Sequence, residues 1–108
     1  MEKTIRIDDK DVKFKSTAAT PRIYRQNTGR DLFVDIQTLQ AASGENINST
    51  IFEDLAYTMA KQTDPTLPDT VLEWLDSFGM FSIYMILPEI IELWQLSSLS
   101  TADVRKNA

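Results

Sequence analysis

The sequence of 108 residues contains no histidine and no cysteine. The absence of histidine removes the commonest general base and the commonest zinc ligand, and the absence of cysteine excludes a disulfide framework and a thiolate metal site. The sequence also lacks a phosphate-binding loop, a GxGxxG motif and a GxSxG motif. Serines are plentiful, but no histidine is present to activate one. We therefore expect no enzyme, no bound metal and no cofactor.

Long apolar runs are also missing. The longest, Met80–Pro88, is interrupted by Ser82 and is far shorter than the ~20 residues that span a bilayer. The first eleven residues, MEKTIRIDDKD, are too charged for a secretory signal peptide. The composition, 43% hydrophobic and 25% charged, is ordinary for one globular domain. We expect a soluble cytoplasmic protein with no membrane partner.

Charge is unevenly distributed along the chain. Residues 1–30 contain eight basic and four acidic residues, a net charge of +4, whereas residues 31–108 contain three basic and twelve acidic residues, a net charge of −9. Such complementary charges favour attraction within one molecule or between neighbouring copies. Two interpretations stay open: a homo-oligomer held partly by these charges, and two halves that are each simply solvated.

Residues 4–15 have the alternating pattern of a β-hairpin. With Asp9-Lys10 as the turn, the apolar cross-strand pairs are Ile7–Val12 and Ile5–Phe14, all on one side of the ribbon. An isolated hairpin is only marginally stable in water, so this apolar side is expected to pack against helices.

Two helices are predicted between residues 20 and 41. Thr20-Pro21 is typical of a helix start, with the threonine as N-cap, and Gly29 indicates the C-terminal stop. The second helix covers about residues 30–41. Its apolar stripe is formed by Leu32, Phe33, Ile36 and Leu39. The polar stretch 42–49 is expected to be a loop.

Capping boxes indicate two further helices. Thr50 and Glu53 fit the start of a helix that ends at Asp64-Pro65. Its apolar face is formed by Phe52, Leu55, Ala56 and Met59. Thr70 and Glu73 fit the start of another helix, which Gly79 is expected to close.

The last predicted helix runs from about residue 81 to 96. Its apolar stripe is formed by Ile83, Leu87, Ile90, Ile91 and Trp94. Because this stripe continues across Pro88, we favour one helix kinked at the proline, and the alternative is a new helix that begins there. The predicted fold is α+β, an N-terminal hairpin packed against a mainly α-helical domain of four to five helices. One domain covers 1–97, with the helices in 20–97, and a flexible polar C-terminal tail covers 98–108.

The second half of the chain has more large apolar side chains than one small core readily hides. Partner-binding residues predicted from this excess and from the basic first half are Trp74, Phe78, Phe81, Tyr84, Trp94, Arg22 and Arg25. A place in the core is the alternative for each aromatic residue. Flexible side chains suited to varied partners are added by Met59, Met80 and Met85.

Two charged groups have other interpretations. Glu89 and Glu92 share a helix face and could bind a divalent ion, but a solvated face explains them, and the acidic residues between 64 and 76 lack EF-hand spacing. A nucleic-acid surface could be formed by Lys13, Lys15, Arg22, Arg25 and Arg30, with Tyr24 among them. Against it, the chain is acidic overall and has no recognition helix with clustered Arg, Asn and Gln.

Five motifs follow one another between residues 20 and 94. They are TPRIYR at Thr20–Arg25, GRDL at Gly29–Leu32, FEDLAYTMAKQTDP at Phe52–Pro65, PDTVLEWLDSF at Pro68–Phe78 and FSIYMILPEIIELW at Phe81–Trp94. With these motifs the chain resembles the tail assembly chaperones of long-tailed bacteriophages and prophages of Gram-positive hosts. No single motif is a signature of that family, and the resemblance rests on their order.

The resemblance implies a viral tail assembly chaperone that works by protein–protein interaction. Members of this family coat the long, aggregation-prone tape measure protein and help recruit tail tube subunits around it. They act in the host cell cytoplasm and are absent from the mature virion. Many are made in two lengths by a translational frameshift, and this chain looks like the shorter product. The alternative from another class is a small phage DNA-binding regulatory protein that uses the basic N-terminal half.

Overall fold

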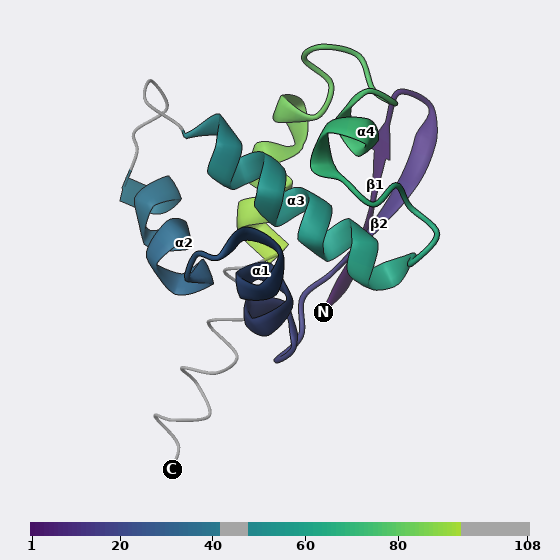
Figure 1. Cartoon of the computed structure of the whole chain (residues 1–108). Helices are drawn as coiled ribbons and strands as arrows, with labels where there is room; N and C mark the ends of the chain where they lie inside the picture. The colour runs from purple at the N-terminus through teal and green to yellow at the C-terminus, as the bar shows by residue number, and fades with distance from the viewer. Residues whose placement is uncertain (42–47, 94–108) are drawn as a thin grey trace.

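The computed structural model describes residues 1–41 and 48–93 (Figure 1). Its elements are two strands, β1 (Glu2–Ile7) and β2 (Lys10–Lys15), then the helices α1 (Thr20–Thr28), α2 (Leu32–Ala41), α3 (Ser49–Thr63) and α4 (Val71–Leu75), and the 3-10 turn η1 (Tyr84–Ile86). A further helix begins at residue 87 and is described to residue 93. The predicted α+β fold, a hairpin packed against helices, is confirmed.

The hairpin turns one residue earlier than the sequence predicted. Asp8 and Asp9 form the turn with φ of 50° and 65°, a left-handed conformation that aspartate tolerates better than most residues. The pairing is therefore Ile5 with Val12 and Ile7 with Lys10, so the predicted register is wrong by two residues. A shift of two keeps every side chain on its own side of the ribbon, and Ile5, Ile7 and Phe14 are buried as expected.

The helix α3 forms the centre of the molecule. It crosses the view in Figure 1 and contacts β2, α1, α2 and α4. Because neighbours surround it, its residues 55–60 are all buried, and so is Phe52, which completes the predicted apolar face. The helix ends before Pro65 as predicted, but its N-cap is Asn48, whose side chain accepts the Ile51 N–H at 3.2 Å. The predicted Thr50 capping box is wrong.

The helices α1 and α2 pack on one side of α3. Gly29 ends α1 with φ of 76° and donates its N–H to the Arg25 carbonyl at 2.8 Å, as predicted. Thr20 does not cap α1, because its hydroxyl is buried and donates to Gln62 on α3 at 2.6 Å. In α2 the predicted stripe is correct except at Phe33, whose side chain is exposed.

The chain after α3 is less helical than the sequence predicted. Thr70 caps α4, accepting the Glu73 N–H at 3.2 Å, but the helix ends at Leu75 instead of continuing to Gly79. Residues 81–86 form turns and η1, and the helix that begins at residue 87 contains Pro88 in its first turn. The single helix kinked at Pro88 is therefore wrong, and the alternative is correct.

The buried residues of this last segment also differ from the predicted stripe. Ile83, Ile86, Ile90 and Leu93 point into the core, whereas Leu87 and Ile91 are only partly buried. Proline fits the first turn of a helix because its missing N–H would have no helical partner there. Trp94 and the predicted tail at 98–108 lie outside the described residues, as does most of the predicted loop at 42–49.

Candidate partner-binding surface

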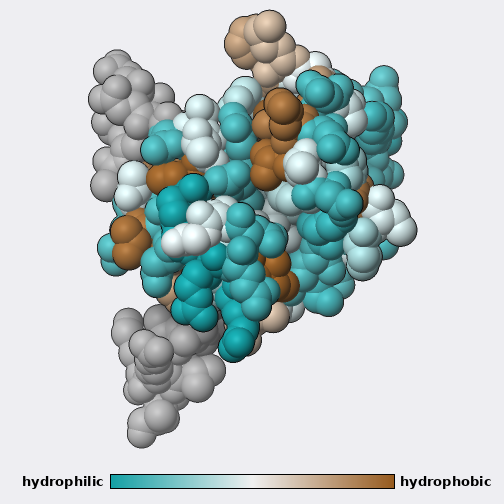
Figure 2. Space-filling view, viewed as in Figure 1, coloured by the Kyte–Doolittle hydropathy of each residue, from teal (hydrophilic) through white to brown (hydrophobic). Residues whose placement is uncertain are grey.

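The exposed apolar side chains of the second half gather at one end of the molecule. The most exposed are Leu72, Met80, Phe81 and Met85, at 70%, 80%, 71% and 79% of their surfaces, and Tyr84 is exposed at 39%. They belong to α4 and to the segment that follows it as far as η1, and we call these five residues the α4–η1 surface. Figure 2 shows apolar atoms projecting from this end, beyond the loop after α4, with more apolar atoms beside α4.

The hairpin turn holds the loop that carries this surface. Asp8 accepts two hydrogen bonds, from the Gly79 backbone N–H at 2.7 Å and from the Ser82 hydroxyl at 2.5 Å. These bonds lower the pKa of the Asp8 carboxyl below its ordinary value of 3.8, and the bond from Gly79 has the largest effect. A Cβ at position 79 would lie 3.0 Å from the Ser82 Oγ, so glycine permits this close approach. We call these contacts the Asp8 clasp.

Lys10 reinforces the clasp from the other side of the hairpin turn. Its ammonium donates to the Ser77 carbonyl at 2.9 Å and lies 5.4 Å from the centroid of the Phe78 ring. On the other side of the loop, Tyr84 donates its hydroxyl to Glu53 on α3 at 2.5 Å. Two distant parts of the chain therefore fix both ends of the segment that presents Met80 and Phe81.

The structure separates the predicted aromatic partner residues. Phe81 and Tyr84 are exposed, but Trp74 is only 2% exposed, because it packs against Tyr57 and meets the Phe78 ring edge-on at 5.2 Å between centroids. Trp74 and partly buried Phe78 line an open groove of about 570 Å³ between β2 and the segment after α3. Trp94 lies outside the described residues.

The methionines divide in the same way. Met59 is fully buried, whereas Met80 and Met85 are among the most exposed side chains of the described residues. The predicted partner-binding set omitted Leu72, and it omitted Met80 and Met85, which the sequence indicated only as flexible side chains suited to varied partners. Local spacing could have placed Met85 on the outer face, because it falls between the buried positions Ile83 and Ile86, whereas Met80 precedes this spacing.

The basic residues are also separated. Arg22 and Arg25 are exposed on α1, and their side chains form no ion pair with another described residue. Arg30 instead lies between α1, α2 and α3, where it donates to Asp35 at 2.8 Å, to Asp54 at 2.5 Å and to the Tyr24 hydroxyl at 3.1 Å. The predicted basic surface therefore loses Arg30, and it loses Tyr24, which is fully buried.

Tyr24, Arg30, Asp35 and Asp54 form one polar network. The Tyr24 hydroxyl donates to Asp35 at 2.5 Å, and burial, followed by this hydrogen bond, raises the pKa of Tyr24. The Arg30 guanidinium donates hydrogen bonds to Asp35, Asp54 and Tyr24. These bonds raise the pKa of Arg30, so the guanidinium stays charged. This network joins the three helices and leaves none of its charged groups unpaired.

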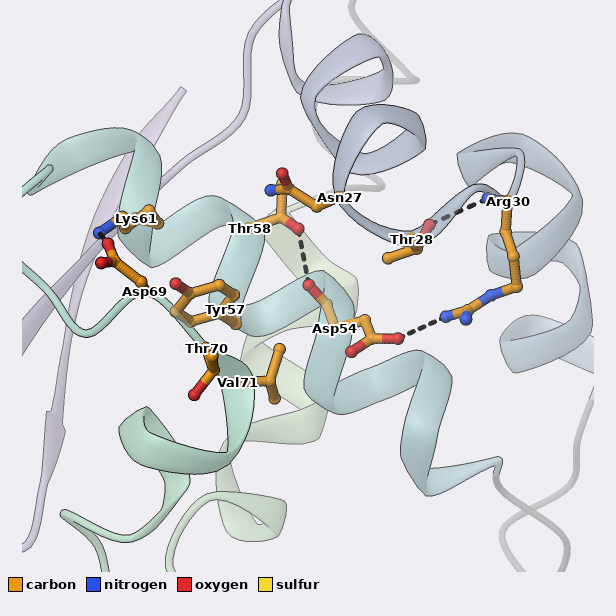
Figure 3. A pocket seen from close by; sticks show the side chains of 10 residues that line it. All are labelled: Asn27, Thr28, Arg30, Asp54, Tyr57, Thr58, Lys61, Asp69, Thr70 and Val71. Carbon is orange, nitrogen blue, oxygen red and sulfur yellow. Dashed lines mark hydrogen bonds and ion pairs between the residues drawn. The ribbon is translucent and has the colours of Figure 1, made fainter.

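A polar pocket of about 640 Å³ opens beside this network (Figure 3). Arg30 and Asp54 stand at one end and Lys61 and Asp69 at the other, with Tyr57 between them. Lys61 is paired with Asp69 at 3.3 Å and donates to the Pro65 carbonyl at 3.0 Å.

The hydroxyls that line this pocket are also engaged. Thr28 donates to the Tyr24 carbonyl at 2.8 Å, Thr58 donates to the Asp54 carbonyl at 2.7 Å, and Tyr57 donates to the Pro68 carbonyl. These lining groups are thus engaged with one another and with the backbone. None of them forms the nucleophile–base pair that covalent catalysis requires.

Metal-binding groups and membrane-spanning helices are absent from the part of the chain that the structure describes. Residues 1–41 and 48–93 hold no group of three or more acidic side chains placed to bind a metal ion. Glu92 instead pairs with Lys3 at 3.5 Å. Within the same ranges, no helix is both long and apolar enough to cross a membrane. Comparisons with protein-family models, with curated proteins and with solved structures found no match to this chain.

Proposed function

We propose that the protein is a tail assembly chaperone that binds the tape measure protein through the α4–η1 surface. The observation that carries this proposal is the exposure of two methionines, a phenylalanine and a leucine on one short segment. Monomeric proteins rarely expose large side chains of this kind together unless a partner covers them. The five motifs that resemble the chaperone family supply the identity of the partner.

The chemistry of this surface fits a helical, apolar partner. A tape measure protein is a long helical rod with exposed apolar stripes, and such stripes dock on surfaces that offer several apolar contacts at once. Methionine has three rotatable bonds and adapts to stripes of different shape, while Phe81 and Tyr84 supply larger, stiffer contacts. Burying each of these side chains completely is worth about 1.5–3 kcal/mol before the entropy costs of binding.

The Asp8 clasp supports the same proposal because it orders the surface in advance. A loop fixed before binding loses less conformational entropy when the partner arrives. The chaperone needs no nucleotide and no catalytic group in this role, so we propose that it is not an enzyme. In this proposal it acts in the host cell cytoplasm, helps to recruit tail tube subunits, and is absent from the mature virion.

Co-expression with fragments of the neighbouring tape measure protein tests this function. The parent chain should keep soluble, and co-purify with, fragments that precipitate when they are expressed alone. Phe81→Glu and Met85→Glu should abolish both effects, because each places a charge in the apolar contact. Val34→Glu is the matched control, since Val34 is an exposed apolar residue on α2. Equal activity of all variants would contradict the assigned surface, and no effect of the parent would contradict the function.

A DNA-binding regulatory protein remains the second candidate. It would use Arg22 and Arg25 on α1 together with Lys13 on the hairpin, all of which are exposed. This candidate has less support, because Arg30 is paired with two carboxylates and α1 is only nine residues long. Measuring duplex DNA binding at low salt separates the two, since phosphate contacts give an affinity that falls steeply with salt.

A further inference from the structure

The outer edge of β1 has backbone groups that point away from the hairpin. Met1 and Ser16 exchange two backbone hydrogen bonds, of 2.9 Å and 2.8 Å. Hydrogen-bonded and non-hydrogen-bonded pairs alternate along an antiparallel ladder. Counting from Met1, the odd-numbered residues of β1 therefore bond to β2, and the backbone N–H and C=O groups of Glu2, Thr4 and Arg6 face outward.

The other edge of the hairpin is covered. By the same alternation the Lys13 carbonyl faces outward from β2, and there the Thr63 hydroxyl of α3 donates to it at 2.9 Å. The helix α3 packs along β2. By contrast, no residue in the described ranges donates a hydrogen bond to the outward carbonyls of β1 or accepts one from its outward N–H groups. An open edge of this kind is a template for another strand.

We propose that β1 pairs antiparallel with β1 of a second copy of this chain, about a twofold axis beside Thr4. In this register Thr4 faces Thr4 of the second copy, and Glu2 of each copy faces Arg6 of the other. All three residues point their backbone groups outward, so each facing pair is a hydrogen-bonded pair. The result is one four-stranded sheet with the order β2–β1–β1–β2 and an isologous interface.

The charges of the hairpin select this register. Within one copy Arg6 stands opposite Asp11, with their charged atoms 3.2 Å apart, and Glu2 stands opposite Lys15. Across the four strands the row is therefore Asp11, Arg6, then Glu2 and Lys15 of the second copy, and its charges alternate in sign. A shift of two residues in either direction would place threonine opposite one member of each pair and would lose the match.

The pairing also fits the size of the sheet. A two-stranded hairpin is marginal by itself, and here it is stabilised by packing against helices; pairing of two copies would enlarge the same sheet to four strands. This dimer does not depend on the proposed function, since it uses the outer backbone edge and the solvent-facing side chains of β1, none of which belongs to the α4–η1 surface.

Charge reversal at the two facing positions tests the register. Analytical ultracentrifugation should show a concentration-dependent dimer for the parent chain. Glu2→Arg alone places two arginines face to face, and Arg6→Glu alone places two glutamates face to face, so each variant should self-associate at least tenfold more weakly. An equimolar mixture of the two variants again joins opposite charges at both positions, and it should form a heterodimer about as strong as the parent dimer. Failure of the mixture to associate would overturn the proposal.

A second variant tests the same interface without relying on the folding of the charge-reversal variants. Thr4→Pro removes an N–H that faces outward and takes no part in the β1–β2 ladder, and proline is tolerated at such edge positions. Circular dichroism should show that the variant folds, while its dimer is lost. A parent that stays monomeric at millimolar concentration, or a dimer that Thr4→Pro leaves intact, would show that the β1 edge is not an interface between copies and would overturn the proposal.

Discussion

Replacing Arg30 by methionine should lower the free energy of unfolding more than most single substitutions of partly exposed residues. Arg30→Met keeps much of the length of the side chain but removes the hydrogen bonds to Asp35, Asp54 and Tyr24. Asp35 keeps the hydroxyl of Tyr24 as a donor. Asp54 keeps no side-chain partner among the described residues, although its side chain is only 15% exposed.

The magnitude follows from the burial of the three charged groups. Removing one member of a buried ion pair costs about 3–5 kcal/mol, chiefly because the remaining charge stays buried without a partner. The Asp35 and Asp54 side chains are 10% and 15% exposed, but that of Arg30 is 38% exposed and partly screened by water. We therefore expect a loss of about 3 kcal/mol, which is a large part of the ~5–15 kcal/mol typical of a small domain.

Urea unfolding followed by circular dichroism measures this loss, with the slope against denaturant checked for constancy. Arg22→Met is the matched control, because Arg22 is exposed on α1 and has no ion pair with another described residue; it should change the free energy of unfolding by less than about 0.5 kcal/mol. Adding Asp54→Asn to Arg30→Met should recover part of the loss, since the uncompensated charge disappears. A loss for Arg30→Met equal to that of the control would refute the network as a source of stability.

Three further outcomes are expected. Trp74→Ala should cost about 3–5 kcal/mol in urea unfolding, because Trp74 fills the space beneath Phe78, and a cost under about 1 kcal/mol would contradict its burial. Pro88→Ala should change the melting temperature little, because Pro88 occupies the first turn of its helix; a large loss would indicate that the proline has a tertiary role. For Asp8, folding lowers the pKa of the carboxyl, so the clasp stabilises the protein above about pH 4 and weakens as the pH falls below the ordinary pKa of 3.8. The difference in melting temperature between the parent and Asp8→Asn should accordingly be largest near neutral pH and shrink in acid, and a constant difference would count against an ionised Asp8.

The sequence predicts those structural elements that depend only on residues close to one another in the chain. The stop at Gly29 follows from a left-handed backbone conformation that glycine adopts without steric cost, and the end of α3 follows from the exclusion of the residue before Pro65 from the helical region. The buried face of the hairpin was also predictable, because alternation survives an error of two residues in the register. The α+β class follows from these local signals taken together.

The predictions from sequence are wrong where two local conformations have similar energies and contacts with distant residues determine which one forms. Asp8-Asp9 and Asp9-Lys10 are both possible turns, and the hydrogen bonds that Asp8 accepts from Gly79 and Ser82 favour the first. Thr20 is a suitable N-cap residue, but its hydroxyl donates instead to Gln62, which lies 42 residues away in the sequence. The sequence around each residue contains neither of these partners.

The candidate surface was determined by the sequence only in its composition. An excess of methionine and aromatic residues after residue 70 predicts that some of them contact a partner, and local spacing does not say which. Trp74 and Phe81 are both large and apolar, but the chain after α4 leaves its helix, so Trp74 packs against Tyr57 while Phe81 projects into solvent. In the same way the sequence does not distinguish Arg30 from the other basic residues. Its ion pairs with Asp35 and Asp54 form only when the three helices pack together. The sequence by itself determined the elements and the kinds of side chain available, because helix ends and alternation depend on neighbouring residues. Only the tertiary structure decided which side chains are buried, paired or exposed, because those states depend on residues that meet only when the chain is folded.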